Sequence, residues 1–449
     1  MQHVIRTACL LIVPVFLPNQ LGAGELRAAA SRVEITPAGS EPLWGYSNRI
    51  GPATGTLDPL FAKVVILDDE TTRLAIVTLD LGRTFNPESM SRVRRRVKSS
   101  SGVEQVFFFA SHTHSGPVVR DTHPNGQPPL WEQKALAGIA GEIELAASRL
   151  VPAKIGVGEG EIQIGHNRRA VQSDGTVKML WRNVEKKPTR PIDPHVGVIR
   201  IDDVDGKAIA VLVNYACHPV VLGPENLQYS ADFPGTMSAV VEESLGPGAV
   251  CLFLQGAAGD INPFYDKMAL DEDGIRLMKQ TGQELGTEVV RVAQAIKTTV
   301  PSDPRLAFAL DTLKFKPRWN VEKVLEMLKT RLDPEAYGRY HDYLTAPLDC
   351  DVMSLIINDD IALMGMPGEP FVNFGKEYRS RSPARHSFFV GYANGYHGYF
   401  PTVDAAATGG YGADTIVARA EVGAGETMLN RAIVRHYELM KKLKPVPSD

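Results

Sequence analysis

The chain has 449 residues, of which 44% are hydrophobic and 22% charged, and its formal net charge is -4 at pH 7. This length and apolar content suffice for a large buried core, in one large domain or in two to three ordinary ones. The slightly acidic balance leaves no basic face for nucleic acid, because the single arginine cluster, at 92–96, fits the solvated face of an expected helix.

The first 24 residues have the pattern of a secretory signal peptide. Arg6 precedes an apolar stretch from Ala8 to Leu17, and residues 21–24 offer small side chains for cleavage. About ten apolar residues are too few to span a bilayer, and no later segment is long and apolar enough. We therefore expect export to the periplasm or the extracellular space, without a transmembrane segment. Contact with a membrane surface stays open.

Cysteine usage gives no sign of a disulfide framework. Removal of the signal would leave Cys217, Cys251 and Cys350, and three cysteines cannot form such a framework. Cys217 and Cys251 lie in apolar runs, so we expect them to be small buried hydrophobic residues.

Three pairs of apolar segments predict hairpins, because each pair flanks a short polar turn. The pairs lie within residues 60–82, 196–215 and 352–366. Helical patterns alternate with them, and the expected helices cover residues 87–98, 131–150, 232–246, 271–297, 320–346 and 426–444. This order predicts an α/β fold with mixed β-sheets, two of them packed face to face and flanked by helices.

Residues 25–449 are expected to form a single domain, because no internal repeat, low-complexity tract or linker interrupts them. A helical insert is expected at about 318–346, as two short helices joined at Asp333-Pro334. It would either cover a functional site as a lid or pack as an ordinary helical element. We favour the second interpretation.

A pair of histidines follows a strongly apolar strand. Residues 106–110 predict a strand buried on both faces, and Gly116-Pro117 ends the segment that carries His112 and His114. In an extended chain, residues two apart point the same way, so both imidazoles would face one pocket. Paired imidazoles suit metal binding and proton transfer. A hydrogen-bonded pair of surface histidines would fit this motif equally well.

Four further apolar strands end in polar or glycine-rich segments. The side chains concerned are His218, Asp260, Asn262, Glu369, Tyr396 and Tyr399. Loops at one edge of a sheet often gather the chemical groups of a site. Two or three histidines with one carboxylate would satisfy the preference of zinc for nitrogen and oxygen ligands. The sequence has no HExxH motif, so a helical zinc-protease site is excluded.

The same motifs, in this order, resemble those of the neutral/alkaline non-lysosomal ceramidase family. They are residues 111–117 (SHTHSGP), 215–219 (YACHP), 259–263 (GDINP) and 394–402. The similarity runs from about residue 30 to 440, and the two histidine motifs are specific in combination. The resemblance implies a zinc-dependent amidase that cleaves the N-acyl bond of a sphingolipid, on a fold of the class expected above.

The resemblance also implies roles for individual residues. The implied ligands of one zinc ion per chain are His112, His218, Glu369 and Tyr399. His114 would take or relay a proton, and Arg168 and Tyr411 would donate hydrogen bonds to a developing oxyanion. Tyr411 follows Tyr399 by twelve residues, as the catalytic tyrosine follows the ligand tyrosine in the family. Whether Tyr396 rather than Tyr399 reaches the zinc stays open.

One motif departs from the family pattern. Asn262 follows Gly-Asp-Ile where the family has a serine after Gly-Asp-Val. A hydroxyl group can act as a nucleophile, whereas a side-chain amide can only donate or accept hydrogen bonds. An acyl-enzyme at residue 262 is therefore excluded, and we expect attack by zinc-activated water, with Asn262 among the polar residues of the site.

We therefore expect an exported zinc-dependent amidohydrolase that acts on an N-acyl lipid. The first alternative is a zinc hydrolase of a non-lipid amide or ester, which a shallow polar pocket would favour over a deep apolar channel. The second alternative is a noncatalytic binding protein on the same fold, although the presence of every candidate ligand argues against it. The sequence leaves the oligomeric state unknown.

Overall fold

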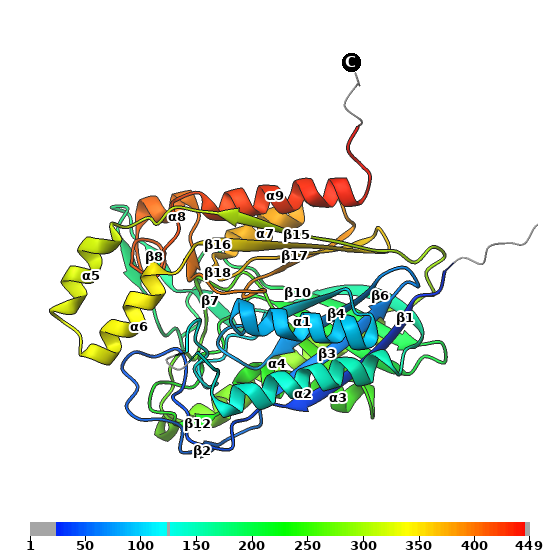
Figure 1. The fold of residues 1–449 in the computed structure, drawn as a ribbon. Coiled ribbons are helices and arrows are strands. Elements are labelled where there is room, and N and C mark those ends of the chain that lie inside the picture. The colour runs from blue at the N-terminus through cyan, green and yellow to red at the C-terminus, as the bar shows by residue number, and fades with distance from the viewer. Residues whose placement is uncertain (1–23, 124–125, 445–449) are drawn as a thin grey trace, which may run out of the picture.

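A computed structural model describes residues 24–123 and 126–444. They form two β-sheets packed face to face, with helices on both outer sides (Figure 1). The predicted fold class is therefore confirmed. The predicted signal peptide lies outside the described residues, apart from Gly24.

The larger sheet has eight strands. Their spatial order is β13 (Val250–Gln255), β11 (Ala208–Tyr215), β10 (His195–Asp203), β6 (Val151–Glu161), β1 (Arg27–Glu34), β3 (Phe61–Asp68), β4 (Arg73–Leu79) and β5 (Gln105–Ala110). The predicted hairpins β3–β4 and β10–β11 are antiparallel, whereas β5 and β13 join their neighbours in parallel. The sheet is curved, as one contact shows. Nζ of Lys63 in β3 lies 2.9 Å from the carbonyl oxygen of Cys251 in β13, although four strands lie between β3 and β13 in the sheet.

The smaller sheet has four strands. Their order is β15 (Leu306–Lys314), β16 (Asp349–Ile357), β17 (Ile361–Gly365) and β19 (His386–Val390). The third predicted hairpin is β16–β17, which is antiparallel. Strand β15 is not among the predicted strands. It lies at the edge of the sheet and most of its residues are only partly buried, and its apolar run covers only residues 306–310, the first five of nine.

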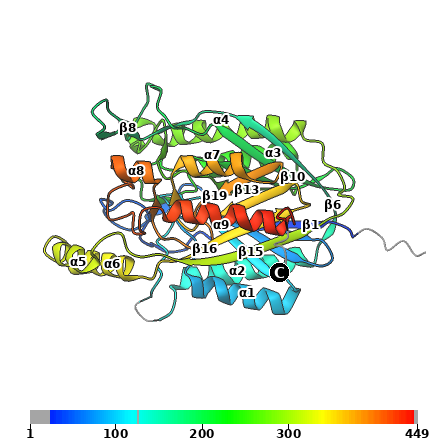
Figure 2. The same ribbon diagram turned by 90° about the horizontal axis from the view of Figure 1, so that it is seen from above.

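Helices cover the outer face of each sheet (Figures 1 and 2). Those on the larger sheet are α1 (Pro87–Ser101), α2 (Leu130–Ala147), α3 (Phe233–Leu245) and α4 (Gly274–Ala295). Those on the smaller sheet are α7 (Val372–Arg381) and α9 (Ala424–Leu439). Helix α9 ends five residues before the predicted Lys444, since Lys441 adopts a φ of 54° that a helix cannot include.

Strand β5 shows how alternate residues connect these layers. Phe107 and Phe109 pack into the core between the two sheets, where Leu355 and Phe388 of the smaller sheet meet them. Phe108 points the other way, into the core beneath α1 and α2. The strand is buried on both faces, as its apolar run predicts.

The helical insert projects from one end of the sandwich (Figure 1). It consists of α5 (Val321–Lys329) and α6 (Pro334–Thr345). Tyr343 donates to the carbonyl oxygen of Val417 at 3.0 Å, and Arg419 donates to that of Ala346 at 2.5 Å. The insert therefore packs against the segment that follows β19, and the choice between a lid and an ordinary helical element stays a prediction.

Short elements complete the described chain. They are β2 (Gly55–Thr56), β7 (Gly165–Asn167), β8 (Arg169–Val171), β9 (Val177–Met179), β12 (Gln228–Tyr229), β14 (Ile261–Pro263), β18 (Glu369–Pro370), β20 (Tyr399–Phe400), α8 (Val403–Thr408) and a 3-10 turn at Leu270–Glu272. Cys217 and Cys251 are buried, as expected, and Cys350 is buried as well; all three are free thiols. No helix in the described ranges has the length and apolar character needed to cross a bilayer.

Candidate metal centre

The segments that carry His112 and His218 meet at the end of strand β13. Gln255, the last residue of β13, is fully buried and its side-chain amide donates to the carbonyl oxygens of Ser111 and Cys217 at 3.0 and 2.8 Å. The amide oxygen also accepts from the backbone N–H of Cys217 at 3.2 Å. One side chain thus fastens both histidine segments, and the curvature of the sheet makes this contact geometrically accessible.

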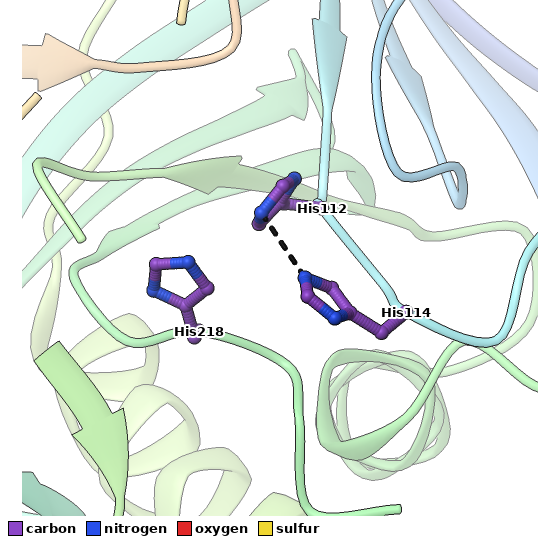
Figure 3. A group of neighbouring side chains, drawn as sticks. All are labelled: His112, His114 and His218. Carbon is purple, nitrogen blue, oxygen red and sulfur yellow. Dashed lines mark hydrogen bonds between the residues drawn. The ribbon is translucent and has the colours of Figure 1, made fainter. Parts of the chain in front are cut away.

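The backbone at His112 differs from the extended chain expected from the sequence. Strand β5 ends at Ala110, and His112 has a left-handed φ of 70°. Residues 112 and 114 therefore do not lie on one side of an extended strand, and that prediction is wrong. The two imidazoles nevertheless face each other, with 3.3 Å between the Nε2 atoms of His112 and His114 (Figure 3).

Three imidazoles come together in the described structure. The candidate donor atoms of His112, His114 and His218 lie within 4.8 Å of one another (Figure 3). Nδ1 of His112 lies 2.5 Å from the carbonyl oxygen of Gly82, and Nδ1 of His218 lies 2.6 Å from that of Ala258. A carbonyl only accepts, so each Nδ1 carries the proton and each Nε2 presents a lone pair.

Glu369 adds a carboxylate from β18, a short strand that follows β17 of the smaller sheet. Its strand, β18, pairs with β20 so that Glu369 lies opposite Tyr399. One carboxylate oxygen, Oε2, lies 3.3 Å from Nε2 of His112 and 3.0 Å from Nε2 of His218. The other, Oε1, accepts a hydrogen bond of 2.5 Å from the hydroxyl group of Tyr396.

These spacings fit zinc. Ligands about 2.0–2.1 Å from a tetrahedral ion lie roughly 3.3 Å from one another. The separations between the two histidine nitrogens and Oε2 of Glu369 are 3.3 and 3.0 Å, and that between His112 and His114 is 3.3 Å. Nitrogen and carboxylate donors with hydrogen-bonded Nδ1 atoms are the donor set that zinc prefers. The group can therefore hold one metal ion.

Burial shifts the pKa of the two histidines His114 and His218, whereas contacts decide that of Glu369. Burial lowers the pKa of His218 to about 4, even though Glu369 opposes the shift. It also lowers the pKa of His114 far below its usual value, with a smaller contribution from His112 and His218. Burial alone would raise the pKa of Glu369, but its contacts with His112 and His218 outweigh burial and hold that pKa well below its usual range. Neutral imidazoles beside a carboxylate are the protonation states in which metals are bound.

The two candidate tyrosines contact different partners. Tyr396 contacts the Glu369 carboxylate, as described above, whereas the hydroxyl oxygen of Tyr399 accepts a hydrogen bond of 3.1 Å from Arg168. The ring of Tyr411 lies 5.5 Å from that of Tyr399, edge to face. The choice between Tyr396 and Tyr399 as a metal ligand stays a prediction.

Arg168 lies at the centre of a group of polar side chains that also includes Asn262, Tyr399 and Tyr411. Its guanidinium group is buried and donates to Oδ1 of Asn262 at 3.1 Å and to the carbonyl oxygen of Gly259 at 2.7 Å. The same group lies 5.2 Å from the ring centre of Tyr411. All the residues implied by the resemblance thus lie in one connected region, and their individual roles remain predictions.

The residues that support His114 were not among those predicted from the sequence. Arg49 donates to the carbonyl oxygen of His114 at 2.8 Å, and the Tyr46 ring packs against the imidazole with 4.8 Å between ring centres. The contact between Tyr46 and His114 is edge to face, whereas the ring of Tyr392 stacks on that of His112, with 4.2 Å between ring centres. Gln255 could be noticed as a polar residue that ends an apolar strand. The other three act through packing and backbone contacts, which leave no pattern in the sequence.

Comparison with known proteins agrees with the motifs. The family model described as "Neutral/alkaline non-lysosomal ceramidase, N-terminal" matches residues 28–280, more than half of the chain. The neutral ceramidase of Pseudomonas aeruginosa is 24% identical over 261 residues, which cover 55% of this chain and 37% of that protein. The matched part therefore spans well under two thirds of this relative.

Solved structures agree at the level of the fold. The crystal structure of neutral ceramidase from Pseudomonas aeruginosa superimposes with a TM-score of 0.72 at 19% identity, covering 95% of this chain and 76% of that one. A structure described as ceramidase complexed with C2 gives a TM-score of 0.71 at 19% identity, covering 95% and 77%. These likenesses establish that the two facing sheets and their helices are a shared architecture.

Proposed function

This chain belongs to the neutral/alkaline non-lysosomal ceramidase family, and from that premise we propose that it is a zinc-dependent amidohydrolase that cleaves the N-acyl amide bond of ceramide or a related lipid. The observation that carries the proposal is the distance from Oε2 of Glu369 to Nε2 of His112 and of His218, 3.3 and 3.0 Å, which is close to the edge of a zinc coordination tetrahedron. Arg168 lies next to these residues, because it contacts Tyr399, which pairs with Glu369 between β20 and β18.

The residues of the site would have separate roles in metal binding and in proton transfer. His112, His218 and Glu369 would hold the ion, with Tyr399 as the fourth protein ligand. Bound zinc supplies a Lewis acid that brings the pKa of a coordinated water to about 7. His114 would accept a proton at Nε2, the atom that faces His112.

Arg168 and Tyr411 would complete the site as hydrogen-bond donors. Burial is the largest influence on the pKa of Tyr411 and raises it, so the phenol keeps its proton at neutral pH. Arg168 stays charged, because Tyr399 and Tyr411 beside it outweigh the effect of burial on its pKa. Fixed donors of this kind stabilise charge that develops on a carbonyl oxygen during attack by water.

Two other functions fit the same residues. A zinc hydrolase of a non-lipid amide or ester would use the same donors on a smaller substrate. A noncatalytic binding protein would keep the fold without turnover. Export to the periplasm or the extracellular space is part of our proposal and rests on the sequence of residues 1–24 alone.

The test combines metal content with hydrolysis in one purified preparation. Wild type, His112→Ala and His341→Ala would be assayed with a short-chain fluorescent ceramide and with a panel of soluble N-acyl amino acids and esters. His341 is an exposed histidine of α6 and serves as the control. We expect one zinc per chain and ceramide turnover in wild type and in the control, and loss of both in His112→Ala.

The other outcomes separate the alternatives. Zinc with turnover of soluble substrates only would refute the lipid assignment and support the smaller substrate. Zinc without turnover on any substrate would support the binding protein. Ceramide turnover at full rate without zinc would refute the metal mechanism.

A further inference from the structure

The orientation of Arg168 rests on neutral acceptors. No carboxylate forms an ion pair with it among the described residues, and its partners are Oδ1 of Asn262, the carbonyl oxygen of Gly259 and the hydroxyl group of Tyr399. A guanidinium group is planar and has its donors in fixed directions, so its aim is set by where these acceptors lie. Asn262 is the acceptor whose side chain could present either of two chemically different ends.

A side-chain amide has a donor end and an acceptor end, and a rotation of 180° exchanges them. Arg168 only donates, so it can be satisfied by the oxygen of Asn262 and is repelled by the amide nitrogen. Something else must therefore hold the nitrogen on the far side. Asp266 does so, because Nδ2 of Asn262 donates to its Oδ2 at 2.7 Å.

Asp266 is suited to this task by its chemistry and its surroundings. An ionised carboxylate only accepts, so it can bind the nitrogen end of Asn262 and cannot bind the oxygen end. Its side chain is fully buried, and Nζ of Lys267 lies 2.8 Å from the same Oδ2 atom and balances the charge. Lys267 is held in turn over the ring of Trp181, at 4.4 Å.

We propose that Asp266 is a positioning residue of the hydrolytic site, which locks the amide of Asn262 in the orientation that aims the guanidinium group of Arg168. Asp266 contacts none of the candidate metal ligands and acts only through Asn262. The assignment rests on the proposed function, because a rate can be lost only if the chain is a hydrolase.

The first test compares Asp266→Ala with Asp271→Ala, which removes an exposed carboxylate five residues further on. Without Asp266, the amide of Asn262 is free to turn its nitrogen towards Arg168. We expect kcat to fall roughly 10- to 100-fold, less than the loss of an entire oxyanion donor, with KM changed less than about 3-fold. Zinc content should stay at the wild-type value, and Asp271→Ala should match wild type in every respect.

The second test exchanges the two side chains and does not depend on the stability of Asp266→Ala. Asn262→Asp alone places two carboxylates in contact and should lose activity. The double variant Asn262→Asp/Asp266→Asn restores an acceptor towards Arg168 and a donor from residue 266, so we expect kcat to recover to within about 5-fold of wild type.

The outcomes distinguish this assignment from the function on which it rests. Asp266 variants that melt earlier but keep the wild-type kcat and KM would show a purely structural role and overturn the assignment. A double variant no more active than Asn262→Asp would overturn it as well. Absence of turnover in wild type would instead overturn the proposed function, and this assignment with it.

Discussion

At the scale of single residues, His114 depends on the glycine that faces it. Gly45 has a φ of 99°, and a Cβ atom there would lie 2.3 Å from the imidazole ring of His114. Gly51 has a similar φ of 93°, but a Cβ atom at Gly51 would have no other atom within 4 Å. Both positions favour glycine because of their positive φ, but only Gly45 also needs glycine to leave room for the imidazole of His114. Comparing variants of the two glycines therefore separates these two effects.

We expect Gly51→Ala and Gly45→Ala to differ mainly in activity. Both variants should lose about 1–2 kcal/mol of unfolding free energy, because alanine is strained at a positive φ. Only Gly45→Ala pushes the His114 ring aside, so only this variant should lose most of its hydrolytic rate. Denaturant unfolding and steady-state kinetics on both variants measure this, and equal rates would show that the position of His114 does not matter.

The backbone of His112 is also strained, and the contacts of this residue offset the strain. Its φ of 70° is strained for a residue with a Cβ atom. Its backbone N–H donates to the carbonyl oxygen of Leu81 at 2.9 Å, and its ring is fixed by Gly82 and Tyr392. The imidazole is therefore held in position by its surroundings before any ion binds.

At the scale of elements, helix α3 begins at an acidic residue buried beneath the surface. Asp232 caps the helix, and its carboxylate accepts from the backbone N–H groups of Phe233 and Leu222 at 2.7 and 3.0 Å. Burial is the main cause that raises its pKa to about 7. The folded protein therefore holds a proton on Asp232 at pH values where the unfolded chain has released it.

This linkage predicts a stability change with pH. The pKa of Asp232 is higher in the folded protein than in the unfolded chain, so protonated Asp232 contributes to the free energy of unfolding. This contribution is complete below about pH 4 and is lost as pH rises to about 7. Between these values the free energy of unfolding falls by about 1.4 kcal/mol per pH unit. Asp232→Asn keeps a capping side chain but cannot titrate, so that part of the slope should vanish. Denaturant unfolding between pH 4.5 and 8.5 tests this, with the exposed turn variant Asp205→Asn as control. An unchanged slope in Asp232→Asn would contradict the prediction.

Local patterns predicted the elements that are strongly apolar or clearly bounded. The three hairpins and most of the helices follow from alternating or helical periodicity and from turn residues such as Asp205 and Gly206. Strand β15 and helices α7 and α8 were not predicted, because their patterns are short: the apolar run of β15 covers only residues 306–310, and the two helices have 10 and 6 residues.

The site divides in the same way. The position of His112, His218 and Glu369 after apolar strands singled them out as candidates, and the family resemblance implied that they are metal ligands. Gln255 and Asp266 could not be assigned, since each acts through atoms brought near by the curvature of the sheet or by a turn. These contacts are a property of the fold, and sequence spacing does not encode them.

At the scale of the whole molecule, the candidate metal centre joins the two sheets. His112 and His218 follow strands of the larger sheet, whereas Glu369 follows β17 of the smaller sheet. An ion bound by all three would connect the sheets at one end of the sandwich. Binding of the ion only to the folded state also adds to the free energy of unfolding.

We therefore expect removal of zinc by a chelator to lower the melting temperature, and added zinc to restore it. Free zinc at about 100 times its Kd contributes about 2.7 kcal/mol to stability. His218→Ala should show no difference between the chelated and the zinc-loaded preparations, whereas His341→Ala should behave as wild type. Calorimetry on each pair measures this, and an equal zinc effect in His218→Ala would place the ion elsewhere.

The order of the strands has a consequence for biosynthesis. The larger sheet is complete when the ribosome has passed residue 255, but the strands that cover its inner face begin at residue 306. Until they emerge, apolar side chains such as Phe107, Ile199 and Leu252 have no partner layer. The growing chain thus passes through a stage in which the apolar inner face of the larger sheet is exposed to other chains. Chaperones that bind such apolar surfaces are needed most in this interval.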